Sequence, residues 1–535
     1  MKEGNPFLQV VDGHVEITEA GHDALRRMVT DSHGQVYAFT NGIPAVIVAA
    51  AMARLSRRAG DLRATILDEF IVSEGSAAEH LIERVVAEYG DDSVQQLVGI
   101  HMVVEGASNL LTKLLEHGRL AAYLEQSTRY IIFYQQDKDG KFLYYTPELP
   151  ETVRPTYIRY MDWIFERYSL TVKELIEYLR KKYPSPTDPK ERTAWLNATK
   201  AQACDAVRPV LPVATKSTVG IFASGQSIES LIMHLASEPL EEARRVGEDI
   251  LREARKVIPS FLKRADDPTR GRMISSYRFE TRSGVRALAR KHLDFSRAGS
   301  STGKIRLVNF WPADELNLVP EMLYESAGGL SLEEIQRQVA DWPIEKKEEV
   351  FRAYMGERKN RRHRPGRALE FAHFEWEIDG RDYGTYRDLQ RHRMVDGWEQ
   401  QRLDISGGYE IPDLIVEADL SVKYKECFDL SRDLFEFMRE NGHELEAQYA
   451  TLLGHRMRYR FMMNAREMFH FLELRTGPAG HPGYRKIGNE IFDIYKRVHP
   501  RSADSMIFVN QGDNPDLTRL AAERATQAKL SRLGE

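Results

Sequence analysis

Hydrophobic and polar residues alternate strictly between Arg456 and Phe461. Such alternation is typical of a half-buried strand, and here it places three arginines on one face and Met, Tyr and Phe on the other. Asn464 follows as a favourable N-cap, and Glu467, three residues later, completes the pattern of a capping box. The pattern therefore predicts a strand that leads directly into a helix.

The helix after Asn464 carries two polar side chains on one face. Arg466 and His470 are four residues apart, and the helix is expected to end at Arg475, before a Gly-Pro pair. Basic side chains at the start of a helix suit the binding of an anion. The same pattern also fits a capped amphipathic helix whose arginines face solvent, and this segment alone favours that simpler interpretation.

Hydrophobic runs elsewhere predict further elements. Residues 43–52 are too few to span a bilayer and predict a buried, alanine-rich helix. We also expect strands at residues 36–39, 131–133 and 305–308, and helices at residues 154–182 and 316–324.

The order of elements occurs twice along the chain. Residues 116–126 resemble residues 390–400 at a constant offset of 274, since Arg119 matches Arg393 (393 − 119) and Glu125 matches Glu399 (399 − 125). Each copy runs strand, helices, basic segment, helical pair, strand and final amphipathic helix. Two copies are too few for a solenoid and indicate a fused dimer. We place a first copy at residues 1–265, a basic connector at 266–303 and a second copy at 304–535.

Composition narrows the class of protein. Of 535 residues, 42% are hydrophobic, which is enough for sizeable cores. Lys and Arg number 75 against 80 Asp and Glu, and the net charge of −5 excludes a polybasic nucleic-acid coat. The two cysteines, Cys204 and Cys427, exclude a disulfide scaffold and a Cys-rich zinc module. Since the sequence shows no secretory or membrane segment, we expect a soluble cytoplasmic protein without membrane partners. Because the charge is balanced, we do not expect a nucleic-acid partner.

Short polar segments carry the candidate chemistry. Arg391-His392-Arg393 offers guanidinium groups, which bind phosphate bidentately, although a basic surface turn would show the same residues. Its counterpart in the first copy is His117-Gly118-Arg119. The histidines lack ligand-type spacing, so no metal site is expected. Residues 356–367 are rich in arginine and fit either an RNA contact or a basic loop beside an anionic ligand.

Residues 125–130 bring a carboxylate, an amide, two hydroxyls, a guanidinium and a phenol together. Glu125 is suited to a sugar hydroxyl, and Ser127, Thr128 and Arg129 are suited to a phosphate. The simpler interpretation is a polar loop before a strand. Arg208 is an isolated cation beside an apolar Pro-Val-Leu-Pro segment, where we expect an anionic partner.

Together these segments resemble the flavin-dependent thymidylate synthases, whose signature is R-H-R-x-x-S-x-N-E-x-S-x-R-Y. The first copy matches its second part at Glu125, Ser127, Arg129 and Tyr130. The second copy matches its first part at Arg391-His392-Arg393 and then at Glu399, while Gln401 and Leu403 replace the serine and the arginine. The resemblance also covers Arg208 before a Leu-Pro pair and Asn464-Ala465-Arg466 at a helix start.

The resemblance implies roles for individual residues. It implies a catalytic role for Arg475, which would polarise the base. It implies substrate binding by Glu125, Gln126, Ser127, Thr128, Arg129, Arg208, Asp388, Arg391 and Arg475. It implies flavin binding by Arg391, His392, Arg393, Glu399, Asn464, Arg466 and His470. Asp388 stands where many relatives have a glutamine that faces the base, which leaves the ring specificity open.

In the family that this chain resembles, the active site lies between two subunits. Each copy of this chain lacks the motif residues that one of those subunits would contribute. The first copy keeps the nucleotide side and the second keeps the flavin side. The resemblance therefore implies two α+β copies, each a mainly antiparallel sheet with helices, docked as a pseudo-dimer with one composite site. Because the family forms four-subunit assemblies, it also implies a homodimer of this chain.

The implied reaction is the reductive methylation of dUMP to dTMP, with FAD as cofactor and methylene-tetrahydrofolate and NADPH as co-substrates. Neither cysteine lies in a plausible context for the nucleophile of a conventional thymidylate synthase. One alternative is the same flavin chemistry on another pyrimidine nucleotide or with another carbon donor. The other alternative is a non-catalytic relative that binds a nucleotide or RNA. The chain retains residues on both the flavin side and the nucleotide side of one site, and this argues against a protein that only binds.

Overall fold

The computed structural model describes residues 4–55, 60–71, 92–297, 301–513, 517 and 519–533. The chain divides into two compact units, the first formed by Met1–Ala107, Leu111–Glu125 and Ser217–Ser296 and the second by Ser108–Leu110, Gln126–Lys216 and Arg297–Glu535. Helices accompany antiparallel strands in both units, which confirms the expected α+β class. Within the described ranges, no helix combines the length and the apolar character needed to cross a membrane.

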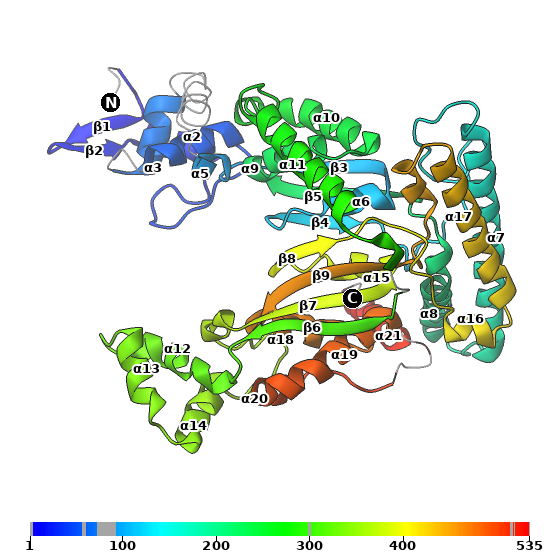
Figure 1. The fold of residues 1–535 in the computed structure, drawn as a ribbon. Helices are drawn as coiled ribbons and strands as arrows, with labels where there is room; N and C mark the ends of the chain where they lie inside the picture. The colour runs from blue at the N-terminus through cyan, green and yellow to red at the C-terminus, as the bar shows by residue number, and fades with distance from the viewer. Residues whose placement is uncertain are drawn as a thin grey trace. The chain divides into compact units, whose positions relative to one another are not determined.

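The first unit contains a hairpin and a three-stranded sheet of order β3–β5–β4 (Figure 1). Strand β4 pairs antiparallel with β5, from Ala121 opposite Ala223 to Glu125 opposite Val219. Helix α9 follows β5 directly, and α10 and α11 pack against it. The elements are β1 (Leu8–Val11), β2 (His14–Ile17), α1 (Glu19–Leu25), α2 (Ala45–Leu55), α3 (Leu62–Thr65), α5 (Asp92–Gln95), β3 (Gly99–Ser108), α6 (Asn109–Leu115), β4 (Ala121–Glu125), β5 (Lys216–Ser224), α9 (Gly225–Ala236), α10 (Glu241–Arg255) and α11 (Gly271–His292).

The second unit is built on a four-stranded antiparallel sheet of order β6–β7–β9–β8, with α18 and α19 against it (Figure 1). The strands are β6 (Lys304–Trp311), β7 (His373–Asp382), β8 (Val395–Gln400) and β9 (Arg456–Asn464). The helices on and around the sheet are α12 (Val319–Leu323), α13 (Leu332–Ala340), α14 (Ile344–Met355), α15 (Tyr383–Leu389), α18 (Ala465–Arg475), α19 (Pro482–Val498) and α20 (Pro500–Asp504).

Four longer segments of the second unit form a helical layer in which α7 packs against both α8 and α17. They are α7 (Arg154–Lys182), α8 (Pro189–Val207), α17 (Ser421–Glu440) and α21 (Leu520–Leu533), with the short α16 (Asp413–Glu417) beside them. Buried residues recur along α7 at helical spacing, among them Met161, Phe165, Tyr168 and Leu175. Because α7 lies in the first predicted copy and α17 in the second, both copies contribute to this unit.

Local patterns in the sequence are confirmed where they are strongest. Strand β9 has Met457, Tyr459 and Phe461 buried, as the alternation predicts, and α7 has the predicted bounds. Asn464 caps α18 by accepting a hydrogen bond from the Glu467 backbone N–H at 2.8 Å. The Glu467 carboxylate, however, bonds to a histidine in another segment.

Two predicted strands are wrong. Residues 36–39 form only an isolated bridge, and residues 131–133 form no strand. Other groups satisfy their backbone instead: the Ala38 N–H donates to the Thr30 hydroxyl at 2.9 Å, and the Phe133 N–H donates to the Tyr168 hydroxyl at 3.3 Å. The basic connector contains a regular helix, α11, which belongs to the first unit. The boundaries of the units thus differ from those predicted for the copies, which stay a prediction.

Candidate functional site

Charged side chains from several segments meet around Asp388, at the end of α15 in the second unit. Four arginines act on its carboxyl group, namely Arg129, Arg208, Arg391 and Arg475. Burial would raise the pKa of Asp388, but these four guanidinium groups together hold it far below its ordinary value. We call the four arginines with Asp388 and Asp205 the arginine cluster.

Arg129 is fixed by a bidentate ion pair. Its Nε and Nη2 donate to the two carboxylate oxygens of Asp205, on α8, at 2.7 and 2.6 Å. Its Nη1 also donates to the Tyr484 hydroxyl, on α19, at 3.3 Å. Burial opposes the ionisation of Asp205, but the hydrogen bonds from Arg129 lower the net pKa of this carboxyl group. Arg129 is therefore a charged and oriented group.

Arg208 begins a short 3-10 helix (Arg208–Val210) directly after α8. Its Nη2 donates to Asp388 Oδ2 at 3.1 Å, and its side chain is only 3% exposed. Its Nε is buried and has no hydrogen-bond partner within the described residues. A buried donor without an acceptor costs free energy, so this N–H is available to an incoming oxygen.

Arg475 ends α18 and is held on several sides. Its Nε donates to His392 Nε2 at 2.8 Å, and its Nη2 donates to the backbone carbonyl of Asp388. The guanidinium carbon lies 5.2 Å from the centre of the Tyr484 ring, which Arg129 also approaches, at 5.9 Å. The ring thus sits between two of the four arginines.

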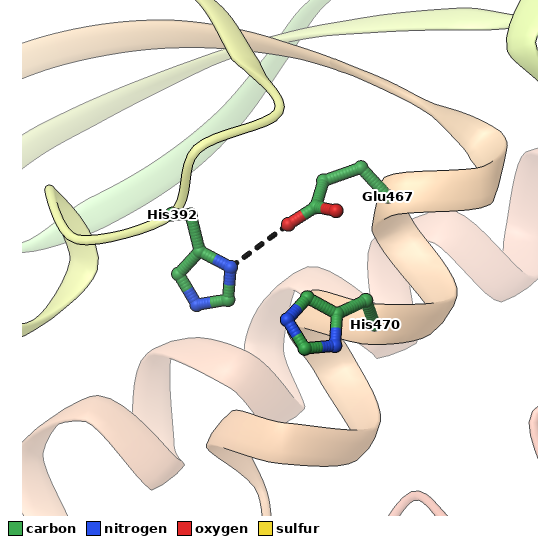
Figure 2. Close-up of side chains that lie close together, drawn as sticks. All are labelled: His392, Glu467 and His470. Atoms are coloured by element: carbon green, nitrogen blue, oxygen red, sulfur yellow. Dashed lines mark hydrogen bonds and ion pairs between the residues drawn. The ribbon is translucent and has the colours of Figure 1, made fainter. Parts of the chain in front are cut away.

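His392, Glu467 and His470 lie together (Figure 2). Arg475 contacts this group through His392. Glu467 and His470 are one turn apart on α18, and the His392 Nδ1 lies 2.8 Å from Glu467 Oε1. Burial, and then Arg475 and His470, lower the pKa of His392 far below its ordinary value. Burial lowers the pKa of His470 to about 4, with further contributions from Arg364, Arg361 and Arg475. Both imidazoles are therefore neutral near pH 7.

The same three side chains could also hold a metal ion, since their ligand atoms lie within 4.8 Å of one another. The surrounding charge opposes this. Arg364, Arg466 and Arg475 all act on Glu467, and their positive potential disfavours a cation at the site. We therefore interpret the group as a hydrogen-bonded network of a neutral histidine and a carboxylate.

A second anchored segment covers α18. Arg358 donates to both carboxylate oxygens of Glu473, on α18, at 2.6 and 2.7 Å, with the side chains 4% and 1% exposed. Seven residues further on, the carbonyl of Pro365 accepts from Arg466 Nε at 3.0 Å. These contacts attach the basic segment 356–367 to the helix at two points, with Arg361 and Arg364 exposed between them.

Other residues expected at the site lie at its edge or have structural partners. Asn464 is the N-cap of α18, and Arg466 pairs with Glu370 at 3.1 Å. Arg393 and Glu399 are exposed, with Glu399 opposite Arg460 in the sheet.

The residues of the 125–130 segment belong to different surroundings. Glu125 is in the first unit, where Lys113 lies 3.3 Å from its carboxylate and both side chains are buried. Gln126 is exposed and is the first residue of the following segment of the second unit. The Ser127 hydroxyl accepts from the Arg129 backbone N–H at 3.2 Å, and Thr128 is buried. The roles assigned to these residues stay predictions.

Sequence patterns alone did not identify Asp205, Tyr484 or Glu467 as members of the site. Asp205 follows Cys204 in a helical stretch and Tyr484 lies in an ordinary amphipathic helix, so neither gives a motif. The sequence pattern around Glu467 indicates only a capping role. The only signal in the sequence was the set of arginines that the resemblance singles out, since a buried guanidinium group such as that of Arg208 requires a carboxylate near it.

Comparison with known proteins identifies the family. The sequence model of the family described as thymidylate synthase complementing protein matches residues 35–260 and, again, residues 306–501. The chain is 30% identical over 534 residues to the UPF0159 protein of Chlamydia pneumoniae, with 95% of this chain and 98% of the relative covered. It is 28% identical over 506 residues to the UPF0159 protein of Thermoplasma acidophilum, with 89% and 97% covered.

A solved structure of a UMP/dUMP methylase from Streptomyces cacaoi, bound with 5-Br dUMP, is 15% identical and covers 40% of this chain and 97% of its own. Its TM-score of 0.31 is too low to define the fold. The two matches to one family model confirm the predicted duplication. This protein therefore belongs to the thymidylate synthase complementing family, the flavin-dependent thymidylate synthases, as a member with two copies in one chain.

Proposed function

We propose that this protein methylates dUMP to dTMP reductively at the arginine cluster. The observation that supports this most is the charge of the cluster. Four arginines and two aspartates leave a net charge of +2 (4 − 2) around the buried carboxyl group of Asp388, with the Arg391 side chain itself exposed. A phosphate monoester carries about −2 at pH 7, so a nucleoside monophosphate would neutralise the cluster.

Arg208 and Arg129 are the groups that we assign to the phosphate. Arg208 has an unused buried donor at Nε, and a phosphate oxygen would satisfy it. Arg129 is held flat against Asp205 and Tyr484, which reduces the conformational entropy that it would lose on binding. Ser127 and Thr128 precede Arg129 in the chain and complete the proposed phosphate contacts.

Arg475 is the proposed catalytic residue. Methylation at C5 requires electron density on a ring carbon, and a guanidinium at the base oxygens stabilises the negative charge that develops there. Arg475 suits this role because His392, the Asp388 carbonyl and the Tyr484 ring fix its position before any ligand binds. Preorganised donors stabilise such charge without reorganising during the reaction.

The residues around α18 fit a flavin. When bound, reduced FAD would supply the hydride and relay the one-carbon unit, which removes the need for a cysteine nucleophile. Burial lowers the pKa of His470, and the arginines that add to this effect, Arg364, Arg361 and Arg475, create a positive potential that would favour an anionic diphosphate. The arginines that would hold the cofactor, Arg391, Arg393 and Arg466, are exposed or half-buried. Asn464 caps the helix that carries Arg466 and His470, and Glu399 follows Arg393 in the chain. We assign Asn464, His470 and Glu399 to the cofactor as well. His392 fits less directly, because both of its ring nitrogens are already engaged.

One observation favours a second candidate substrate. Asp388 replaces a glutamine, and the four arginines keep its carboxylate ionised, so it can only accept hydrogen bonds. A cytosine nucleotide offers an exocyclic amino group at the ring position where uracil has an oxygen. The same flavin chemistry on dCMP is therefore the alternative. In either case we propose methylene-tetrahydrofolate and NADPH as co-substrates and a homodimer of the chain as the assembly.

Purified protein tests the proposal. We expect flavin absorbance, and transfer of labelled carbon from methylene-tetrahydrofolate to dUMP in the presence of NADPH, with dCMP assayed in parallel. Arg475→Ala should lower kcat by about 100-fold or more, as the loss of a charge-stabilising donor does. Arg497→Ala, an exposed arginine on α19, is the matched control. Full activity of Arg475→Ala, or the absence of transfer to any pyrimidine nucleotide, would refute the proposal.

A further inference from the structure

Glu467 and Arg475 lie near opposite ends of α18, and the described residues show no direct hydrogen bond between them. The two residues are eight positions apart, which corresponds to about 12 Å along the helix axis at about 1.5 Å per residue. His392, which lies in the segment between α15 and β8, bridges them: its Nδ1 is 2.8 Å from Glu467 Oε1 and its Nε2 is 2.8 Å from Arg475 Nε. A single imidazole therefore links two points of the helix.

The chemistry of the two bonds fixes the tautomer of His392. A guanidinium has only donors, so the His392 Nε2 that faces Arg475 must carry the lone pair. A neutral imidazole has one proton, which then sits on Nδ1 and is donated to the Glu467 carboxylate. With His392 and Glu467 only 6% and 4% exposed, water does not offer either group an alternative partner of comparable strength.

From this geometry we propose that Glu467 is a positioning residue: it holds His392 in the Nδ1–H tautomer, and His392 in turn holds the Arg475 guanidinium toward the substrate site. The catalytic consequence rests on the proposed function, whereas the hydrogen-bonded chain does not. Without the Glu467 acceptor, His392 could place its proton on Nε2. Two donors would then face each other at Arg475, and the guanidinium would turn away.

The charged groups around Glu467 determine its behaviour with pH. Burial raises its pKa to about 7, against the opposing influence of Arg364, Arg466 and Arg475. Arg364 belongs to the basic segment 356–367, the other two arginines belong to α18, and the facing histidines are neutral. The carboxylate is ionised above about pH 7, and an ionised acceptor binds the His392 N–H more strongly. Positioning of Arg475 therefore improves as the pH rises through this value.

A metal ion would require a different arrangement of protons. To act as a ligand beside Glu467 and His470, His392 would use Nδ1 and carry its proton on Nε2. That proton would point at the Arg475 Nε–H, whose bond to His392 would then be lost. The observed bond from Arg475 thus favours the hydrogen-bonded chain.

The tautomer can be measured on the full chain without nucleotide. Two-bond 1H–15N correlation spectra of 15N-histidine-labelled protein, assigned with His392→Gln, should show His392 protonated at Nδ1. Glu467→Leu should shift it toward Nε2–H or a mixture, whereas His470→Asn, the matched control on the same helix, should leave it unchanged. A His392 protonated at Nε2 in the native protein, or binding of added Zn²⁺ that displaces the Nδ1 proton at stoichiometric concentration, would overturn the proposal.

Kinetics provide the second readout. Glu467→Leu should lower kcat by about 10- to 100-fold with a smaller change in KM, as residues that orient a catalytic group do. Glu467→Gln keeps an acceptor but no charge, so it should retain more activity and should lose the rise of kcat near pH 7. A native pH profile that Glu467→Gln leaves unaltered would contradict the role. If the tautomer is as expected and no nucleotide is methylated, the proposed function fails while the positioning chain stands.

Discussion

Replacing Asp388 by Asn removes one negative charge from the arginine cluster and leaves the side-chain volume almost unchanged. Its Oδ2 accepts from Arg208 Nη2 at 3.1 Å, and the two side chains are 12% and 3% exposed. Opposite charges at such a distance attract by about 5 kcal/mol at an effective dielectric constant of about 20. The charge of the cluster would rise from +2 to +3 (4 − 1).

The expected cost follows from the buried partner that is left behind. Buried pairs that lose one member destabilise proteins by about 3–5 kcal/mol. Because asparagine keeps an acceptor for Arg208, we expect the lower end, a loss of about 3 kcal/mol in the free energy of unfolding. Urea unfolding of the native and Asp388→Asn proteins measures this as a lower transition midpoint. Inorganic phosphate should raise the midpoint more in Asp388→Asn than in the native protein, because it supplies the missing negative charge.

A surface ion pair provides the matched control. Asp429 lies 2.7 Å from Arg432 on α17, and the side chains are 55% and 50% exposed. Asp429→Asn should cost less than about 1 kcal/mol, as exposed pairs do. If Asp388→Asn costs no more than Asp429→Asn and phosphate affects both alike, then Asp388 is not the counter-charge of a buried cation site and the reasoning is wrong.

Two further predictions concern the frame of the site. Glu473→Gln should lower the unfolding free energy by about 3 kcal/mol, because it leaves the buried guanidinium of Arg358 without its bidentate partner, and flavin titration should show weaker binding as the basic segment loses its anchor. Unchanged stability and flavin affinity would exclude that anchoring role. Leu175→Ala, at a fully buried position of α7, should cost about 2–5 kcal/mol in chemical denaturation, whereas Leu170→Ala, at a position 45% exposed, should cost far less. Equal costs would show that this helix face is not packed.

Local periodicity predicted the elements that carry much of the site. The alternation before Asn464 defined β9, and helical spacing defined α7 with its buried Met161 and Tyr168. The strands expected at residues 36–39 and 131–133 do not form, because apolar β-branched and aromatic residues favour extended structure only where a neighbouring strand is present.

The partners of the arginines are long-range contacts that no local pattern contains. Arg129 pairs with Asp205, 76 positions away, and reaches Tyr484, 355 positions away. Only the tertiary fold brings these groups together. The resemblance to a family identified Arg129, Arg208 and Arg475 as candidates and assigned His392 to the flavin, and these roles stay predictions. The structure places His392 between a carboxylate and a guanidinium, since this chain has Glu467 at the start of α18.

The packing of α7 against α17 has a consequence for how such a chain is inherited. Each helix covers an apolar face of the other. A polypeptide cut between them would therefore yield two fragments with exposed hydrophobic surfaces that are prone to aggregate. Because the two copies are joined in one chain, they are always produced in one-to-one stoichiometry. In a symmetric dimer a substitution changes both subunits, whereas here it changes only one of the two copies. Each copy can therefore lose residues that the other copy retains.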